Sequence, residues 1–315
     1  MNKLKQKAIV VLGPTSSGKS DLAIKLAKRF KGEIISADSR QIYRHLNQGT
    51  GKILGTWEKE PEGKRKVFAS KNIPHHLIDF LPLRQSYSVA QFKVDCERLL
   101  SDISSRKKLP IICGGTGFWI AAVTDGLIFP KIKPNKSLRI KLEKKSTKNL
   151  FEDLKKIDPR RAEKIDSNNK QRLIRALEIC TAIGRVPQVK SKPHPEFDFL
   201  KIGLFRTKEE LNQKIQSRLK TRWLNGMIKE VQELNKNHKL SWKKIQSFGL
   251  AYYWIPLYLQ GEINLATLKE KVYLAEKNYA KRQRTWFKRD LQIHWLSSEE
   301  EIFNQVANFI QKSSL

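Results

Sequence analysis

Short apolar runs alternate with helical periods along the first 126 residues. Runs typical of buried strands lie at residues 8–12, 33–37 and 109–113. Around them, apolar side chains recur at the spacing of one helix face at 21–30 and 88–100. This order of strands and helices predicts an α/β fold with a parallel sheet and right-handed crossovers.

The pattern changes after residue 126. Charged helical stretches at 136–147 and 171–183 are set among proline-containing segments. We therefore predict a helical insertion domain at 127–196, within a core formed by residues 1–126 and 197–315.

The last third of the chain is predicted to be mostly helical. A strand is expected first, at 197–205. Helical periods follow at 208–225, 228–235, 250–259 and 265–286.

Positive charge dominates the composition. Lys and Arg number 62 against 31 Asp and Glu, which gives a formal net charge of +31. Such an imbalance indicates a polyanionic partner such as nucleic acid, although a lysine-rich genome also produces basic enzymes. No apolar run approaches the ~20 residues that a membrane helix needs, and the N-terminus has no secretory signal pattern. Three widely spaced cysteines fit neither a disulfide framework nor a zinc site, so a cytoplasmic location is expected.

Residues 13–20 form the clearest motif. They match the phosphate-binding pattern G-x-x-x-x-G-K-[ST] in full and lie between a predicted strand and a predicted helix, so a chance match in a Gly/Ser loop is the weaker interpretation. Backbone N–H groups and the helix N-terminus would face an anion, Lys19 would neutralise phosphate charge, and Ser20 would offer its hydroxyl to Mg²⁺ or a phosphate oxygen. The residues expected to contact phosphate are Gly13, Pro14, Thr15, Ser16, Ser17, Gly18, Lys19 and Ser20.

The motif alone does not identify the phosphate compound. Most such loops bind a nucleoside triphosphate in kinases and ATPases. An ATPase needs a carboxylate at the end of a second apolar strand, whereas the strand at 109–113 ends in glycines. The sequence therefore weakens the ATPase interpretation.

Two polar residues follow predicted strands. Asp38 comes after the strand at 33–37, and Thr116 lies in the glycine-rich turn after 109–113. Because parallel strands bring their carboxyl ends to one crevice, we expect both near the phosphate loop. Asp38 could bind Mg²⁺ or accept a proton from a nucleophile, or simply cap a helix; Thr116 could be an ordinary turn residue.

Cations and aromatic side chains alternate at residues 280–289. The Arg and Lys side chains suit RNA phosphates, whereas helical spacing places Trp286 and Phe287 in the core. The pair His75-His76 invites a metal-site interpretation, but a loop position is favoured because adjacent histidines cannot both face one helix-borne ion.

Seven segments spread over almost the whole chain form a family signature. They are GPTSSGKS at 13–20, EIISADSRQIY at 33–43, PHHLID at 74–79, GGTGFW at 114–119, DPRRAEKID at 158–166, QRLIRALEI at 171–179 and AKRQRTWFKR at 280–289. The first is shared by many phosphate-loop proteins, whereas SADSRQIY and AKRQRTWF together are specific. On these segments the chain resembles the bacterial tRNA dimethylallyltransferases (tRNA isopentenyltransferases).

The resemblance implies an activity and a fold. The activity is transfer of a dimethylallyl group from dimethylallyl diphosphate to N6 of the adenosine just 3′ of the anticodon (tRNA position 37), which gives N6-dimethylallyladenosine and diphosphate. The implied fold is a P-loop kinase-like core with a helical insertion domain that binds tRNA and a helical C-terminal region. Expected partners are the anticodon stem-loop of tRNA and the prenyl donor, with Mg²⁺ as cofactor and the chain acting as a monomer.

The resemblance also implies residue roles. The expected catalytic residues are Asp38, which would accept a proton or hydrogen bond from adenine N6, Ser20, which would bind Mg²⁺, and Arg218, which would grip the diphosphate. The target adenine would leave its stack to reach them. The expected tRNA contacts are Asp38, Ser39, Arg40, Gln41, Thr116, Arg139, Gln171, Arg172, Leu173, Ile174, Arg175, Lys281 and Arg282.

Two segments depart from the family pattern. Residues 247–252 read SFGLAY where an Ile-Gly-Tyr-Lys-Glu-like segment is common, which puts a charged contact there in doubt. Phe118-Trp119 replaces the usual Leu-Tyr, and only a packing change is expected from it.

Three rival interpretations remain. A small-molecule P-loop kinase would consume ATP. A free-nucleotide isopentenyltransferase of the cytokinin type would have little use for the +31 charge. A non-catalytic RNA-binding protein would have no reason to keep Lys19, Ser20 and Asp38 together.

Overall fold

The three apolar runs predicted as strands lie in the middle of one sheet. The structure, a computed structural model, describes residues 5–59 and 66–311. In order across the sheet the strands are β10 (Ile293–Leu296), β9 (Phe197–Leu204), β1 (Gln6–Leu12), β6 (Leu109–Gly114), β2 (Gly32–Ser36), β5 (Ile73–His76), β4 (Lys66–Ser70) and β3 (Thr56–Lys59). From β10 to β5 every pairing is parallel, which confirms the predicted parallel sheet; β4 and β3 add an antiparallel edge that the sequence did not predict.

Two compact units divide the chain. Unit 1 comprises Met1–Gly126 and Pro193–Leu315, and unit 2 comprises Leu127–Lys192. The first boundary coincides with the predicted change at residue 126, and the chain returns to unit 1 at residue 193 rather than 197.

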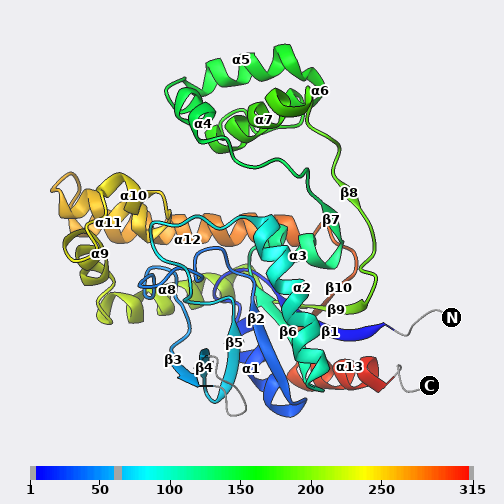
Figure 1. Cartoon of the computed structure of the whole chain (residues 1–315). Helices are drawn as coiled ribbons and strands as arrows, with labels where there is room; N and C mark the ends of the chain where they lie inside the picture. The colour runs from blue at the N-terminus through cyan, green and yellow to red at the C-terminus, as the bar shows by residue number, and fades with distance from the viewer. Residues whose placement is uncertain (1–4, 60–65, 312–315) are drawn as a thin grey trace. The chain divides into compact units, whose positions relative to one another are not determined.

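Helices cover both faces of the sheet in unit 1 (Figure 1). Alternate residues of β1 serve the two sides: Ile9 and Val11 pack with α1 (Lys19–Arg29) and α13 (Glu299–Gln311), whereas Val10 and Leu12 face the opposite core. That second core includes α2 (Val89–Ser105) and α3 (Gly117–Thr124). A strand that is apolar on both faces therefore reads as a continuous apolar run, as at residues 8–12.

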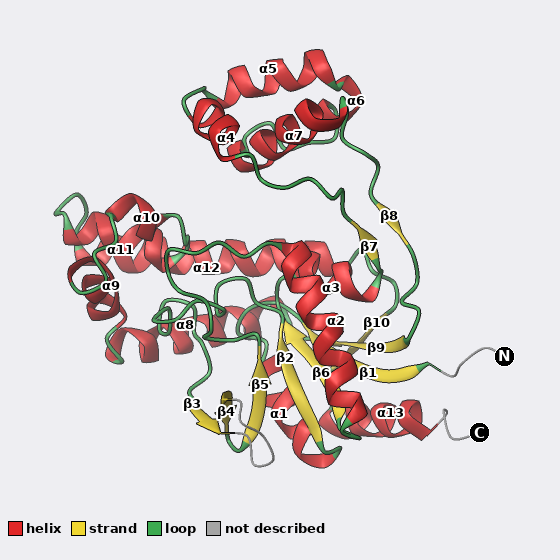
Figure 2. Ribbon diagram, in the orientation of Figure 1, coloured by secondary structure: helices red, strands yellow, loops and turns green. Residues whose placement is uncertain are grey.

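The C-terminal region of unit 1 is helical, as predicted. Figure 2 shows these helices in red beside the yellow sheet. Their bounds are α8 (Lys208–Leu224), α9 (Met227–Lys236), α10 (Trp242–Gln246), α11 (Ala251–Leu259) and α12 (Leu265–Phe287). Four of them match predicted ranges to within a few residues, and α10, like α3 and α13, was not predicted.

Unit 2 is a small helical domain with its own core. Its elements are β7 (Leu127–Ile128), α4 (Lys136–Glu143), α5 (Thr147–Ile157), α6 (Pro159–Ala162), α7 (Lys170–Ile183) and β8 (Lys190–Ser191). Leu150 and Leu154 of α5 pack with Leu173 and Leu177 of α7, all of them buried. Within the described residues of either unit, no helix combines the length and apolarity that crossing a bilayer requires.

Candidate active site

Three neighbouring strands end at one edge of the sheet. The register pairs Leu12 of β1 with Gly114 of β6, and Ser36 of β2 with Cys113 of β6. The segments that follow these strands are the phosphate loop, the Asp38 turn and the glycine-rich turn. Because parallel strands place their carboxyl ends together, three motifs far apart in sequence meet at one crevice.

The phosphate loop turns sharply between β1 and α1. Gly13 and Gly18 have φ of +149° and +95°, values that side-chain-bearing residues rarely adopt, and α1 begins at Lys19. The loop borders a cavity of about 650 Å³, which we call the catalytic cavity. Five of the eight predicted phosphate residues line it, namely Thr15, Ser16, Gly18, Lys19 and Ser20. Gly13, Pro14 and Ser17 shape the turn instead of lining the cavity.

Gln283 of α12 braces this loop against the glycine-rich turn. Its Oε1 accepts a hydrogen bond from the Thr15 N–H (2.8 Å), and its Nε2 donates to the Gly115 carbonyl (2.8 Å). A Cβ at position 115 would lie 2.3 Å from Nε2, so a side chain there would displace the Gln283 amide from this position. Residue-by-residue sequence reasoning missed Gln283, although it lies inside the segment AKRQRTWFKR.

Arg218 reaches the phosphate loop from α8. Its Nη1 donates to Thr15 Oγ1 (3.0 Å) and its Nη2 to the Gly51 carbonyl (2.5 Å). Gly51 has φ of +58°, and a Cβ there would meet Nη2 at 2.1 Å, so this glycine leaves room for the guanidinium. The structure thus places Arg218 beside the phosphate loop, and its contact with the diphosphate stays a prediction.

Two partly buried cations, Lys19 and Arg218, line the catalytic cavity. Burial lowers the pKa of Lys19, and the nearby Arg218 lowers it further. Burial likewise lowers the pKa of Arg218, with Arg222 as the next cause. Both shifts mean that positive charge is unfavourable here without a partner. A bound polyanion would supply that partner, and the α1 N-terminus faces the same cavity.

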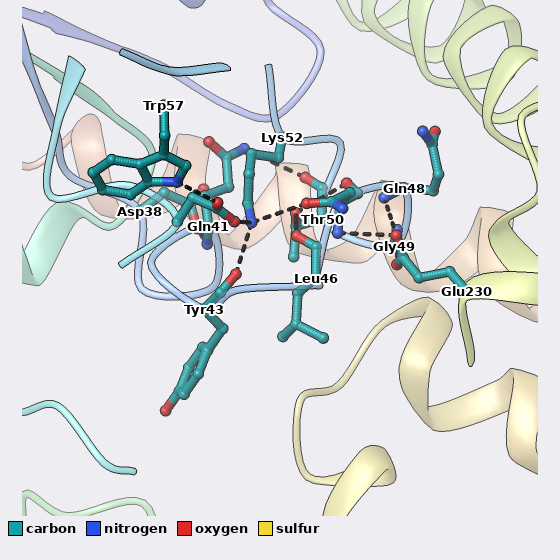
Figure 3. A network of polar contacts seen from close by, with 12 residues as sticks. Asp38, Gln41, Tyr43, Leu46, Gln48, Gly49, Thr50, Lys52, Trp57 and Glu230 are labelled. Atoms are coloured by element: carbon teal, nitrogen blue, oxygen red, sulfur yellow. Dashed lines mark hydrogen bonds and ion pairs between the residues drawn. The ribbon is translucent and has the colours of Figure 1, made fainter. Parts of the chain in front are cut away.

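A clamp from three helices holds the loop at residues 47–51. Glu230 of α9 accepts hydrogen bonds from the Gln48 N–H (2.7 Å) and the Gly49 N–H (3.0 Å), as Figure 3 shows. Arg222 of α8 donates to the carbonyls of Gln48 and Gly49 and forms a buried ion pair with Glu276 of α12 (2.8 Å). The sequence did not single out this loop, because its partners are remote in the chain.

Replacing Glu276 with alanine should destabilise unit 1. The side chains of Arg222 and Glu276 are each only 5% exposed, so the variant leaves a buried guanidinium without its counter-charge. The cost should be about 3 kcal/mol, near the lower end of the range for broken buried pairs, because Arg222 keeps its two carbonyl acceptors. Urea unfolding measures it, with the exposed Glu270→Ala on the same helix as control. Equal stability of the two variants would contradict the clamp.

Asp38 stabilises the turn in which it lies and also lines the catalytic cavity. Its Oδ1 accepts hydrogen bonds from the backbone N–H groups of Arg40 (2.9 Å) and Gln41 (3.3 Å), the local bonding pattern of the capping alternative. Together with Ser39, Arg40 and Gln41 it borders the same cavity as Lys19. Thr116 does not line the cavity; its Oγ1 accepts from the Ser39 N–H (3.1 Å) and so ties the Asp38 turn to the glycine-rich turn after β6. The fixed turn leaves a carboxylate facing the cavity.

The segment at residues 247–252 also forms cavity wall. Phe248, Gly249, Leu250 and Tyr252 line it, where the family pattern would place charge. The Tyr252 hydroxyl donates to Glu230 Oε1 (2.6 Å), so it reinforces the 47–51 clamp. Burial and the neighbouring Glu230 raise the pKa of Tyr252, so it stays a hydrogen-bond donor.

Some of the predicted tRNA contacts in unit 2 are exposed and others are buried. Gln171 and Arg172 are exposed at the start of α7. Arg139 and Arg175 both pair with Glu178 and keep exposed edges. The expectation is wrong for Leu173 and Ile174, which are 0% and 4% exposed in the core of this unit, because an RNA contact needs surface.

The predictions for residues 280–289 hold in part. Phe287 is buried, as expected, but Trp286 is 39% exposed. Arg282 lines the catalytic cavity, and Lys281 lies one residue before it on the exposed side of α12. A helical period did not separate the two aromatics because consecutive residues point only about 100° apart.

The histidine pair lies in a strand, not in the predicted loop. His75 Nδ1 bonds the Ile73 carbonyl oxygen (2.8 Å), and His76 Nε2 bonds Glu33 Oε2 (2.8 Å). Within β5 the two rings point to opposite faces and find separate partners. Across residues 5–59 and 66–311, no group of three His, Cys, Asp or Glu side chains is placed to hold a metal ion.

Comparisons with known proteins agree with this arrangement. A family model described as IPP transferase matches residues 41–290, and one described as isopentenyl transferase matches residues 6–75. The tRNA dimethylallyltransferases of Carboxydothermus hydrogenoformans and Halothermothrix orenii are each 38% identical to this chain, over 98% and 97% of its length and 97% and 92% of theirs.

Solved structures give the same result. The tRNA isopentenylpyrophosphate transferase of Bacillus halodurans superposes with a TM-score of 0.70 at 31% identity, covering 98% of both chains. A eukaryotic dimethylallyltransferase acting on tRNA gives a TM-score of 0.71 at 27% identity, over 90% of this chain and 70% of its own. On sequence and structure together, this chain belongs to the IPP transferase family.

Proposed function

We propose that this enzyme is a tRNA dimethylallyltransferase, which transfers a dimethylallyl group from dimethylallyl diphosphate to N6 of the adenosine 3′ of the anticodon, tRNA position 37. One observation carries the proposal most strongly. The phosphate loop, the half-buried Arg218 and the carboxylate of Asp38 border a single cavity. That cavity can take an anionic leaving group and a nucleophile that must lose a proton.

The leaving group is diphosphate. As the bond between the prenyl carbon and the diphosphate oxygen breaks, negative charge grows on the diphosphate. Lys19, Arg218 and the N–H groups at the start of α1 stabilise that charge more strongly than they stabilise the intact donor. The lowered pKa of both cations fits this role, because the growing negative charge on the diphosphate offsets the cost of partly burying the two positive charges.

The nucleophile is the exocyclic amine of adenine, which is weak because its lone pair is delocalised into the ring. The N6–carbon bond forms as the carbon–oxygen bond breaks, and the proton lost from N6 passes to Asp38. The turn bonds to Oδ1 hold this carboxylate in place. The products are N6-dimethylallyladenosine and diphosphate.

Mg²⁺ fits the donor set of this site. Magnesium commonly binds through one or two protein oxygens together with substrate phosphates, and Ser20 and Asp38 supply such oxygens on the cavity wall. When bound, the ion would neutralise diphosphate charge. Ser20 would hold it, and Lys19 would contact the phosphate oxygens beside it.

The adenosine must be extracted from the anticodon loop to reach this cavity. The excess of basic residues suits RNA, and we propose that the monomeric enzyme binds tRNA in the cytoplasm through α12 and the exposed basic residues of unit 2. Incubation with dimethylallyl diphosphate, Mg²⁺ and an unmodified anticodon stem-loop should yield a dimethylallylated adenosine by nucleoside mass spectrometry. ATP consumption with no RNA product would favour a kinase instead.

Removing Lys281 and Arg282 together should flatten the salt dependence of tRNA binding. If each contacts a loop phosphate, the double alanine variant should lower the slope of log K against log salt by about 1.4, that is ~0.7 for each single-strand contact. Filter binding over a range of KCl concentrations measures the slope. The control pair, Lys28→Ala with Lys108→Ala, removes exposed cations near the opposite ends of the strands. An unchanged slope in the first pair would count against these contacts.

A further inference from the structure

A second hollow lies on α12 next to the catalytic cavity. Its volume is about 370 Å³, within the range of roughly 300–1,000 Å³ that small-ligand sites occupy. We call it the Trp286 hollow, and its lining residues are Asn278, Lys281, Arg282, Thr285, Trp286 and Arg289. The lining combines one large aromatic ring with three cations.

The indole of Trp286 is fixed in place, although much of it is exposed. A Cβ at Gly117 would lie 2.1 Å from Cδ1 and 2.3 Å from Nε1, so the pyrrole edge occupies the space that this glycine leaves. Phe118 meets the ring edge-on, with centroids 6.2 Å apart. The side chain nevertheless keeps 39% of its surface exposed. A rigid, partly exposed aromatic ring provides a stacking surface at little entropic cost.

Carboxylates do not neutralise the three cations of the hollow in the part of the chain that the structure describes. Within the described part of the chain, Lys281, Arg282 and Arg289 form no ion pair with any carboxylate. Arg282 lies over the ring of Tyr279, 5.8 Å from its centroid, which directs it along the helix surface. The combination of an aromatic platform with cations that no carboxylate neutralises is the recognition chemistry of an unpaired nucleotide.

Arg282 joins the hollow to the catalytic cavity. It lines both spaces, whereas Trp286 lines only the hollow. The reacting adenine therefore cannot use Trp286 while it occupies the catalytic cavity. A nucleotide bonded directly to the target adenosine can do so, because the phosphate between them would lie at Arg282.

We propose that the Trp286 hollow binds the unpaired nucleotide next to the target adenosine, with its base stacked on Trp286 and the connecting phosphate at Arg282. This inference rests on the proposed function and assigns it a second nucleotide subsite. The subsite holds the loop open: stacking on Trp286 replaces the stacking that the neighbouring base loses when the target leaves the loop. Trp286 is thus a positioning residue, and Gly117 and Phe118 keep its ring in register.

The subsite is tested by combining a substitution of Trp286 with the removal of one base from the RNA and asking whether their effects on kcat/KM are additive. Three stem-loops are compared: the native one and two with an abasic site, either 5′ or 3′ of the target. One abasic substrate should react about tenfold more slowly in kcat/KM with the wild-type enzyme, within the range for loss of one base–aromatic stack. Trp286→Leu should slow the native substrate by a similar factor of about ten. The same abasic site should then add less than about twofold in that variant, because the shared interaction is already gone.

Several controls separate stacking from damage to the fold. Trp286→Phe keeps an aromatic face and should recover most of the activity that leucine loses. Diphosphate affinity should be unchanged in Trp286→Leu, because Trp286 does not line the catalytic cavity. Tyr253→Leu removes another exposed aromatic, 45% accessible on α11, and should react with all three substrates as the wild type does.

A fluorescent base gives an independent measurement. With 2-aminopurine placed at the position where the abasic site is costly, binding to the wild-type enzyme should quench its fluorescence, and binding to Trp286→Leu should not. An undiminished abasic effect in Trp286→Leu, or wild-type rates in that variant, would overturn the subsite while the proposed function stands. Failure of the wild-type enzyme to modify the native stem-loop would overturn both.

Discussion

Replacing Asp38 with asparagine should lower kcat for dimethylallyl transfer about 10³-fold, within the range of roughly 10²–10⁴ that a positioned base contributes. The asparagine carbonyl oxygen can still accept the turn bonds from Arg40 and Gln41, so the backbone should remain in place. What the variant loses is the negative charge that accepts the N6 proton. The loss should therefore appear in kcat, with tRNA affinity largely kept.

Single-turnover rates and filter binding on the same samples measure the two quantities. Asp38→Ala should be at least as slow, because it removes the turn acceptor as well. Asp21→Asn is the matched comparison, since Asp21 is another carboxylate that borders the cavity without a turn role. If Asp38→Asn reacts at a rate near that of the wild type, Asp38 has no part in the proton transfer.

Replacing Arg218 with alanine should lower kcat by a factor of about 10²–10³, the usual loss when one preorganised donor to a developing anion is removed. Arg218→Lys should recover little of it. A single ammonium cannot bridge the Thr15 hydroxyl and the Gly51 carbonyl, which the guanidinium joins from one fixed fork. The apparent affinity for inorganic diphosphate should fall in both variants.

Steady-state kinetics with varied dimethylallyl diphosphate, together with product inhibition by diphosphate, measure these effects. Lys220→Ala removes an exposed cation of the same helix and serves as the control for net charge. An Arg218→Ala enzyme that changes only its KM for tRNA would place this arginine on the RNA rather than on the leaving group.

The expected effects of the Asp38 and Arg218 variants depend on a site that is held together both by local loop geometry and by long-range contacts. The turn of the phosphate loop is set locally by its glycines and the start of α1, and Gln283 of α12 braces it from a distance. Arg218 and the 47–51 loop depend on α8, α9 and α12, which hold them through Arg222, Glu230 and Glu276. Damage to the clamp should therefore weaken diphosphate binding even where no contact to the ligand is removed.

The sequence alone predicted what local chemistry determines. Patterns among neighbouring residues determine the apolar strands at 8–12, 33–37 and 109–113, the phosphate loop between a strand and a helix, and the long C-terminal helices. The position of Asp38 at the crevice followed as well, because a residue after a parallel strand has little choice of edge.

Some predictions failed at residues whose location depends on solvent exposure or on a partner that is remote in the sequence. The sequence pattern placed His75-His76 in a loop and Trp286 in the core, and the family resemblance offered Leu173 and Ile174 as RNA contacts. Histidine and tryptophan occur in either location, and a motif shared with a family does not show whether an aliphatic residue within it is exposed. Packing against α3 left Trp286 at the surface, and packing between α5 and α7 buried the two aliphatic residues.

The tertiary structure alone decided how the site is held together. Arg218 meets Thr15 across 203 positions of sequence, and Gln283 meets the same residue across 268. Nothing local marks such pairs, since a helical arginine or glutamine reads as an exposed surface residue until its partner is known. The sequence therefore determined which anion-binding loop the protein has, and long-range packing determined which side chains complete it. The physical reason is that backbone conformation depends on neighbouring residues, whereas a buried polar contact needs two surfaces that only folding brings together.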